Sequence, residues 1–309
     1  MLKSSFILSL LAGFMMIAFS SCEEEVMETP NSEKSVAEIA ADDSQFSTLV
    51  SALERVDLVG VLNGSGPFTV FAPTNNAFDA LGVDLATISD EALSEILLYH
   101  VFGAQVNAGD IAEGQTYLGM AAATGPNGTN LSLLVENTAG KVIINGDVNV
   151  TATDIIGKNG VIHVVDKVIM PMDIVGHAAA NANFSELVGA LGAATGDLVT
   201  VLSGDGPFTV FAPLNSAFEA ISSTVAGLSA DQLSKVLTYH VAAGNVRSTD
   251  LSDMMEVTTV NGETFTINLG SEVTITDAQG NTAKILLTDV QATNGVIHVL
   301  ESVILPNDL

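Results

Sequence analysis

The feature that most constrains this chain is a short stretch that occurs twice. Residues 66–78 read GPFTVFAPTNNAF and residues 206–218 read GPFTVFAPLNSAF, so 11 of 13 positions are identical. Two further blocks recur in the same order. Tyr-His-Val stands at 99–101 and 239–241, and Asn-Gly-Val-Ile-His-Val stands at 159–164 and 294–299. Three ordered blocks repeated over this distance indicate two duplicated domains, because solenoid repeats are much shorter.

The spacing of the blocks sets the domain boundaries. The first two blocks recur after 140 residues and the last after 135, so the first copy holds five additional residues, most simply in the loop 124–130. We expect copy 1 to span residues 36–171 and copy 2 to span residues 172–309. A chain of 309 residues is long enough for each to bury a core of its own. Almost no linker separates them, so the two domains should touch.

Each copy begins with helical patterning and continues with strands. Apolar residues fall at three- and four-residue steps over 36–53 and 184–191. Phe-Thr-Val-Phe then has the composition of a strand buried on both faces. Alternating strands are expected after the helices, at 131–136, 141–144, 148–151, 264–269 and 272–276. Helices followed by an antiparallel sheet predict an α+β domain.

Two segments of the second copy have the spacing of a capping box. Ser216 is followed three residues later by Glu219, and Ser229 is followed three residues later by Gln232. In such a box the serine side chain and the acid or amide satisfy each other's free backbone N–H groups. We therefore expect one helix to begin at each serine.

The N-terminal segment has the features of an export signal. Lys3 precedes an apolar run of 14 residues, 6–19, which is shorter than the roughly 20 residues of a membrane-spanning helix. Small residues then lead to Cys22, and we expect residues 1–21 to be a signal peptide that is removed. As the only cysteine, Cys22 cannot form an internal disulfide. Its setting resembles a bacterial lipoprotein box, in which the cysteine is lipidated; the alternative is a free thiol.

Residues 22–35 are acidic and polar, which predicts a tether. The run 23–25 resembles the signal that sends lipoproteins of some Gram-negative bacteria to the outer cell face, although a solvated tether explains it too. The expected location is therefore the cell envelope, lipid-anchored to the outer membrane and facing outward. With 36 acidic and 9 basic residues the net charge is −27, which disfavours nucleic-acid partners.

The histidines are the main candidates for chemistry. His100 and His240 lie on the apolar face of predicted helices, and His163 and His298 alternate with apolar residues on predicted strands. A metal site or an acid–base pair would need more ligands or a carboxylate at fixed spacing. We interpret the four as core residues and predict no catalytic residue, no metal site and no cofactor. His177 has no counterpart in copy 1 and is expected to be solvated.

The repeated blocks resemble those of the fasciclin (FAS1) domain. The resemblance covers nearly all of the chain after the tether and implies two tandem domains, each a β-wedge or sandwich packed by several helices. It also implies a secreted or membrane-anchored protein without a general catalytic activity. The residues that carry the resemblance as structural motif positions are Phe71, Pro73, Phe78, Tyr99, His100, His163, Phe211, Pro213, Phe218, Tyr239, His240 and His298.

The function implied by this resemblance is non-catalytic adhesion at the cell surface. The partner would be a protein or glycan on other cells, in matrix or in a biofilm, and the membrane would be contacted through the lipid anchor only. An alternative is an accessory lipoprotein that binds a small ligand or polysaccharide, which requires a concave pocket with a few polar groups. An exposed apolar patch would favour adhesion.

Overall fold

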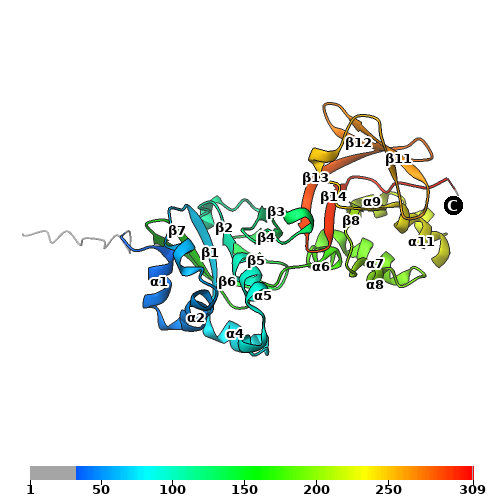
Figure 1. The fold of residues 1–309 in the computed structure, drawn as a ribbon. Helices are drawn as coiled ribbons and strands as arrows, with labels where there is room; N and C mark the ends of the chain where they lie inside the picture. Colours follow the sequence, from blue (N-terminus) through cyan, green and yellow to red (C-terminus); the bar gives the residue numbers. More distant parts are fainter. Residues whose placement is uncertain (1–32, 308) are drawn as a thin grey trace, which may run out of the picture. The chain divides into compact units, whose positions relative to one another are not determined.

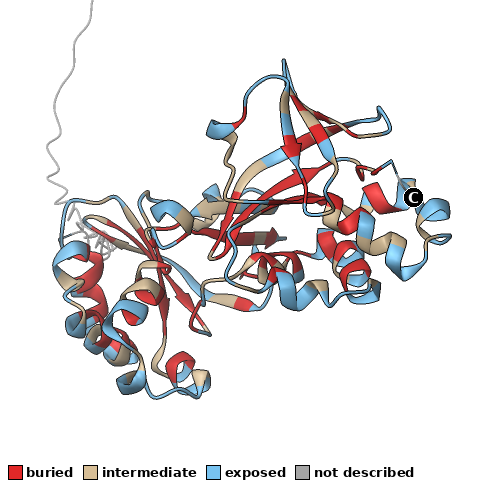
Figure 2. Ribbon diagram, turned by 45° about the vertical axis from the view of Figure 1, so that its right-hand side comes forward, coloured by how far each residue is buried: buried red, intermediate tan, exposed pale blue. Residues whose placement is uncertain are grey.

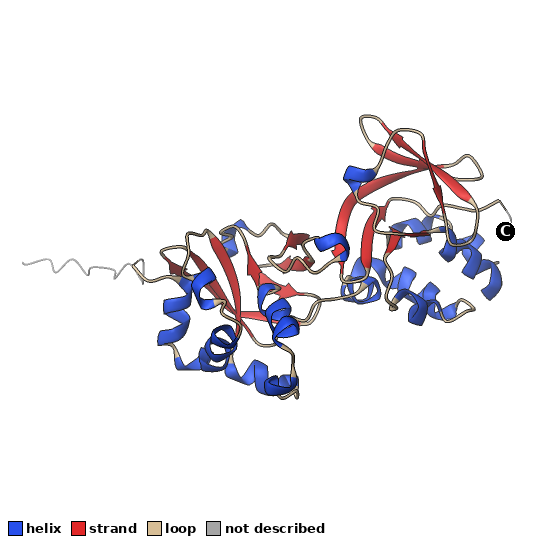
Figure 3. Cartoon of the chain, viewed as in Figure 1, coloured by secondary structure: helices blue, strands red, loops and turns tan. Residues whose placement is uncertain are grey.

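Each copy of the repeat folds around one seven-stranded sheet, with most of its helices ahead of most of its strands (Figures 1 and 3). The computed structural model describes residues 33–307 and 309. The predicted signal peptide, Cys22 and most of the predicted tether lie outside the described residues.

In copy 1 the helices are α1 (Val36–Asp42), η1 (Ser44–Phe46), α2 (Ser47–Arg55), α3 (Val59–Leu62), α4 (Asn75–Leu81), η2 (Leu85–Thr87), α5 (Asp90–Leu98), η3 (Ala108–Asp110) and η4 (Pro126–Gly128). The strands are β1 (Phe68–Pro73), β2 (Val101–Phe102), β3 (Gly114–Gly119), β4 (Ser132–Thr138), β5 (Lys141–Ile144), β6 (Val148–Gly157) and β7 (Gly160–Val165).

In copy 2 the helices are α6 (Ile174–Ala180), η5 (Ala182–Phe184), α7 (Ser185–Ala193), α8 (Leu198–Leu202), α9 (Asn215–Ala220), α10 (Ser222–Val225), α11 (Ala230–Tyr239) and η6 (Ser248–Asp250). The strands are β8 (Phe208–Pro213), β9 (Val241–Ala243), β10 (Met255–Thr258), β11 (Thr264–Leu269), β12 (Val273–Thr276), β13 (Thr282–Ala292) and β14 (Gly295–Leu300).

The two sheets have the same topology. Their orders are β2-β1-β7-β6-β5-β4-β3 and β9-β8-β14-β13-β12-β11-β10. Strand β1 pairs in parallel with β7, and β8 pairs in parallel with β14, while the other pairs are antiparallel. The α+β prediction is confirmed, but a purely antiparallel sheet was wrong. A local pattern of alternation cannot show that the first strand of a domain pairs with its last.

The repeated Asn-Gly block joins the ends of each domain. The carbonyl of Asn159 accepts a hydrogen bond from the Phe68 N–H at 2.9 Å. Its side-chain oxygen accepts from the Val36 N–H at 2.9 Å, and its amide donates to the Leu62 and Gly64 carbonyls at 2.7 and 2.8 Å. Asn294 makes the equivalent bonds in copy 2, to Phe208, Ile174, Leu202 and Gly204.

Strands β1 and β8 are buried on both faces, as the sequence predicts. Val70 and Ala72 point into an apolar cluster shared with the helices, while Phe71 joins a second cluster formed by the other strands. The same division holds in copy 2, where Val210 faces the helices and Phe211 faces the strands. Figure 2 shows the buried residues concentrated on the strands and the inner helix faces. Each domain is therefore a nearly closed β-wedge with helices packed against it.

One of the two predicted helix starts is correct. Ser229 and Gln232 form a capping box at the start of α11. The prediction at Ser216 was wrong, because α9 already begins at Asn215. The Asn215 amide group instead bridges to α7 and η5, accepting from the Glu186 N–H at 2.9 Å and donating to the Ala182 carbonyl at 2.9 Å.

Candidate functional site

The repeated Tyr-His pair lies at the end of α5 and of α11. His100 contacts the Ile96 carbonyl through Nδ1 at 2.7 Å and accepts the Ile169 N–H at Nε2 at 2.9 Å. His240 makes the same two contacts, with the Val236 carbonyl and the Ile304 N–H. Both rings are thus neutral, with Nδ1 protonated. Burial lowers the pKa of each to about 4.

The tyrosines beside these histidines bond to strands of the sheet. The Tyr99 hydroxyl donates to the Ser132 carbonyl at 2.6 Å, and the Tyr239 hydroxyl donates to the Thr264 carbonyl at 2.8 Å. Burial raises the pKa of both phenols, to about 12 for Tyr239. In each pair the tyrosine therefore joins the end of a helix to a later strand, and the histidine joins it to the segment that follows the last strand.

The strand histidines are bonded in the same way. His163 Nε2 contacts the Val106 carbonyl at 2.8 Å, and its ring lies 5.6 Å from the ring of Phe71. His298 Nε2 contacts the Val246 carbonyl at 2.9 Å, and its ring lies 5.3 Å from that of Phe211. The Nδ1 atoms face the backbone N–H groups of Asp154 and Asp289, both at 3.4 Å, so backbone groups lie against both nitrogens of each ring.

The other motif positions are also parts of the core. Phe78 and Phe218 are buried against the helical clusters, and Pro73 and Pro213 are buried at the ends of β1 and β8. Among residues 33–307 and 309, no three His, Cys, Asp or Glu side chains are grouped so that they could hold a metal ion. The repeated motif therefore positions strands and helices.

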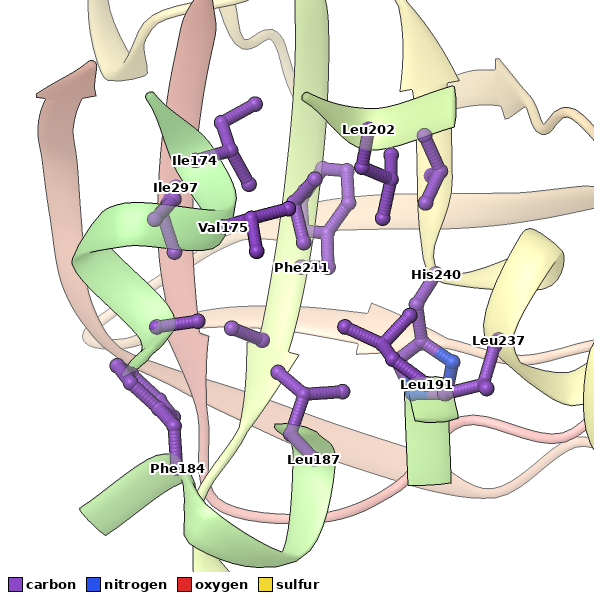
Figure 4. Close-up of a pocket in the computed structure, with 14 residues that line it drawn as sticks. Ile174, Val175, Phe184, Leu187, Leu191, Leu202, Phe211, Leu237, His240 and Ile297 are labelled. Atoms are coloured by element: carbon purple, nitrogen blue, oxygen red, sulfur yellow. The ribbon is translucent and has the colours of Figure 1, made fainter. Parts of the chain in front are cut away.

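A small cavity lies in the core of copy 2, where side chains of α6, α7 and β8 surround a space that His240 borders on one side (Figure 4). It offers about 20 Å³ of space for the centre of a water molecule. That is enough for one water, which needs roughly 10–15 Å³ and two or more polar partners. Its walls, including Leu187, Leu191 and Phe211, are almost entirely apolar. We interpret it as a packing gap and assign no ligand to it.

His177 corrects one expectation. We expected it to be solvated, but it is 0% exposed and packs 6.0 Å from the ring of Tyr117, which belongs to copy 1. Neither ring nitrogen has a hydrogen-bond partner among the described residues. Burial lowers its pKa to about 4, and the charge of Asp173 and the nearby backbone of Gln291 oppose that shift. The sequence could not show this, because the covering side chain comes from the other domain.

The two copies touch through specific contacts, as the short linker predicts. Within the unit formed by residues 31–309, the Gln291 N–H donates to the Ser132 hydroxyl at 2.9 Å. The Asn181 amide donates to the Tyr117 hydroxyl at 3.0 Å. The additional residues of copy 1 lie next to this contact. Tyr99 and the carbonyl it binds are 33 residues apart, whereas the equivalent pair in copy 2 is 25 apart. Copy 1 is thus eight residues longer here, and copy 2 is three residues longer between this point and the last repeated block, which leaves the net difference of five.

A cleft of about 470 Å³ lies beside these contacts and is lined mainly by polar residues of both copies. The loop 127–130 forms one side, and Arg247, Asp289 and Gln291 form the other. Arg247 Nη2 lies 3.8 Å from an Asp289 carboxylate oxygen, and its buried Nε has no partner among the described residues. Sequence reasoning missed this cleft. Its only signal was the difference in loop length.

The helix lengths and the family match bear on the whole chain. Within the described residues, no helix combines the length and apolar character needed to span a bilayer. The Fasciclin domain family model matches residues 44–171 and 182–306. Both matched ranges contain all three repeated blocks.

Known proteins resemble the chain in sequence and in fold. Protein sll1483 of Synechocystis sp. is 45% identical over 140 residues, which cover 44% of this chain and 74% of that protein. Periostin of Homo sapiens is 27% identical over 288 residues, covering 90% of this chain and 32% of periostin.

A FAS1 domain pair from the insect cell adhesion molecule Fasciclin I has the same fold, with a TM-score of 0.53. Its sequence identity is 17%, and the match covers 85% of this chain and 98% of that one. The fasciclin family is generally non-enzymatic and often adhesion-related. On the family match, the topology and the repeated blocks, this chain belongs to the fasciclin family and carries two tandem fasciclin domains.

Proposed function

We propose that this protein is a non-catalytic adhesion protein that attaches its cell to other cells, to matrix or to a biofilm. The observation that carries the proposal is the fasciclin match over both domains, together with the fold shared with a domain pair from a cell adhesion molecule. The bonding of the histidines in the repeated blocks to backbone groups supports a structural role for these blocks.

Two exposed leucines also support a binding role. Leu286 and Leu287 are neighbours on β13, and they are 45% and 43% exposed. Leu287 also lines the cleft between the copies. Large apolar side chains beside a concave polar surface are typical of sites that contact another molecule.

The proposed anchor is a lipid on Cys22, which would hold the protein on the outer membrane and facing outward. The support is the sequence alone: a short apolar run, small residues before the only cysteine, and an acidic segment after it. An acidic tether would keep the domains away from an anionic lipid surface by charge repulsion.

Deleting the gene should lower cell aggregation and surface attachment, and expression of the wild-type protein should restore both. The Cys22→Ala variant should leave the membrane fraction, because no acyl chain would hold it, and should restore attachment poorly. Ser32→Ala, a matched change in the same segment, should behave like wild type. Attachment assays and membrane fractionation measure these outcomes. Normal attachment by the deletion strain would contradict the adhesion role, and membrane-bound Cys22→Ala protein would contradict the anchor.

A second candidate function is polysaccharide binding in the cleft between the copies. The cleft's polar walls favour a hydroxyl-rich ligand, and the guanidinium of Arg247 suits a sugar carboxylate. Arg247 is only weakly engaged by Asp289, since the two groups are 3.8 Å apart.

Uronic-acid tetrasaccharides should therefore bind more tightly than neutral glucose tetrasaccharides. Arg247→Gln should weaken uronate binding about 10-fold, because a charge-assisted bond is lost. Lys284→Gln removes the same charge from a salt bridge with Glu272 outside the cleft and should change nothing. Calorimetric titration gives these affinities. Equal binding of both sugars, or an unaffected Arg247→Gln variant, would rule this candidate out.

A further inference from the structure

A groove of about 610 Å³ crosses the helical layer of copy 2, between α7, α9–α10 and the start of α11. Small side chains line much of it, among them Ala190, Ala193 and Ala230. The carboxylates that line it are Glu186 and Glu219, and its lining contains no basic residue. The groove is therefore anionic, and its small residues leave room for a long side chain.

Copy 1 shows what the equivalent groove holds. It measures about 550 Å³ and is lined by Arg55, the last residue of α2. The Arg55 guanidinium donates to the Leu85 carbonyl and to the Ile88 carbonyl, both at 2.6 Å. Its Nε donates to an Asp90 carboxylate oxygen at 2.8 Å. An arginine of the same chain thus forms part of the wall of the groove in copy 1, held there by two backbone carbonyls and a carboxylate.

Copy 2 has the same groove but lacks both the arginine and the aspartate that bond to each other in copy 1. Helices α2 (STLVSALER) and α7 (SELVGALGA) align residue for residue, so Ala193 occupies the position of Arg55. Ser89 and Ser229 cap the next long helix of each copy, so Ala230 occupies the position of Asp90. By the same alignment Val225 and Leu228 stand where Leu85 and Ile88 stand, and both line the groove.

Two carboxylates line the groove of copy 2 in place of the Asp90 carboxylate of copy 1. Glu186 stands at the position of Thr48 in α2, so it adds a negative charge that copy 1 lacks. Glu219 keeps the charge of Asp79. A guanidinium entering this groove would meet acceptors of the two kinds that hold Arg55, backbone carbonyls and carboxylate oxygens.

We propose that the groove of copy 2 binds an arginine side chain presented by another polypeptide. The methylene groups of the arginine would pack on the alanine-lined surface, and its planar guanidinium would donate to the carbonyls and to Glu186 or Glu219. A second copy of this chain is a poor source. It has two arginines, of which Arg55 is already bonded and Arg247 lines the cleft between the domains. This inference rests on the proposed role as a binding protein and names the chemistry of its partner.

The test uses the full-length protein and the peptide acetyl-Ala-Leu-Arg-Leu-Ala-amide. Two matched peptides carry lysine or citrulline in place of the arginine. We expect one peptide per protein, with the arginine peptide bound about 10-fold more tightly than the citrulline peptide and several-fold more tightly than the lysine peptide. Equal binding of arginine and lysine peptides would indicate only general attraction to an acidic protein, and it would overturn the proposal.

Two substitutions exchange the properties of the grooves. Ala193→Arg places a guanidinium where copy 1 has one and should weaken peptide binding at least about 10-fold. Gly192→Arg adds the same charge one residue away, outside the groove lining, and should bind like wild type. Arg55→Ala should create a second site and raise the stoichiometry from one to two. Both substituted positions, 192 and 193, are exposed, so folding should be unaffected. Unchanged binding by Ala193→Arg would refute the assignment.

The outcomes separate this inference from the adhesion proposal. If the peptide fails to bind while the deletion strain loses attachment, the groove proposal is refuted and the adhesion proposal is supported. If the peptide binds as expected while attachment is normal in the deletion strain, the groove proposal is supported and the adhesion proposal is refuted.

Discussion

Gly295→Ala should unfold the second domain. A Cβ at this position would lie 2.0 Å from the Phe208 carbonyl oxygen and 2.8 Å from the Phe208 nitrogen and from Ile174 Cδ1. Two of these three atoms are backbone of β8, so relief would require β8 and β14 to separate. That pair lies inside the sheet and is buried on both faces, and we expect a loss of about 4 kcal/mol or more.

The measurement is urea unfolding followed by circular dichroism. Gly192→Ala is the matched control, because a Cβ there meets nothing within 4 Å and Gly192 lies inside helix α7. It should stabilise the protein by about 0.5–1 kcal/mol. Gly160→Ala should affect copy 1 as Gly295→Ala affects copy 2, since its Cβ would lie 2.2 Å from the Phe68 carbonyl oxygen. An unchanged unfolding midpoint for Gly295→Ala would show that β14 does not approach β8 this closely.

Acidification from pH 6.5 to 4 should remove much of the folding free energy. His100, His177 and His240 are buried, and burial lowers the pKa of each from 6.5 to about 4. In this window the unfolded chain binds more protons than the folded one, so stability is complete above pH 6.5 and falls as the pH drops to 4. Each histidine contributes on the order of 3 kcal/mol to this loss, and the loss is divided between the domains, with His100 in copy 1 and His177 and His240 in copy 2.

His177→Phe tests one part of this effect separately. Neither ring nitrogen of His177 has a hydrogen bond of ordinary geometry among the described residues, and its interaction with the Gln291 backbone opposes the pKa shift only in part, so phenylalanine can replace it beside Tyr117 at little cost. Carboxylates also titrate near pH 4, and the comparison must therefore be between wild type and variant at each pH. Unfolding free energies at pH 7, 5.5 and 4.5 should fall less steeply for the variant. If both proteins lose the same free energy, His177 is not buried in its neutral form.

The sequence predicted those parts of the fold that depend on neighbours along the chain. The duplicated blocks showed two domains, the alternation at 141–144 and 264–269 matched β5 and β11 residue for residue, and Ser229 caps α11 as expected. The prediction that a helix begins at Ser216 was wrong, because the spacing of a capping box does not show which nearby residue ends the extended backbone. There the Asn215 side chain is bonded to another helix.

Contacts between distant segments could not be predicted in this way. The parallel pairing of β1 with β7 depends on how the whole domain closes. The burial of His177 depends on Tyr117 from the other copy. The difference between Arg55 and Ala193 is visible when the copies are aligned, but only the packing of α7 against α9 and α11 shows that the alanine lies in the wall of a groove. The cleft at Arg247 required both domains.

The pairing of the first strand with the last also governs when each domain can form during synthesis. Strand β1 lies between β2 and β7, and Phe68 pairs with Gly160. The edge of β1 that faces β7 therefore stays unpaired until Gly160 has been synthesised. Contacts so distant in sequence slow folding, because a long loop must close first. Until the final strand arrives, β1 has an apolar unpaired edge that can associate with other chains. A nascent chain therefore has two vulnerable periods, one for each domain, and each ends only when its Asn-Gly-Val-Ile-His-Val segment emerges.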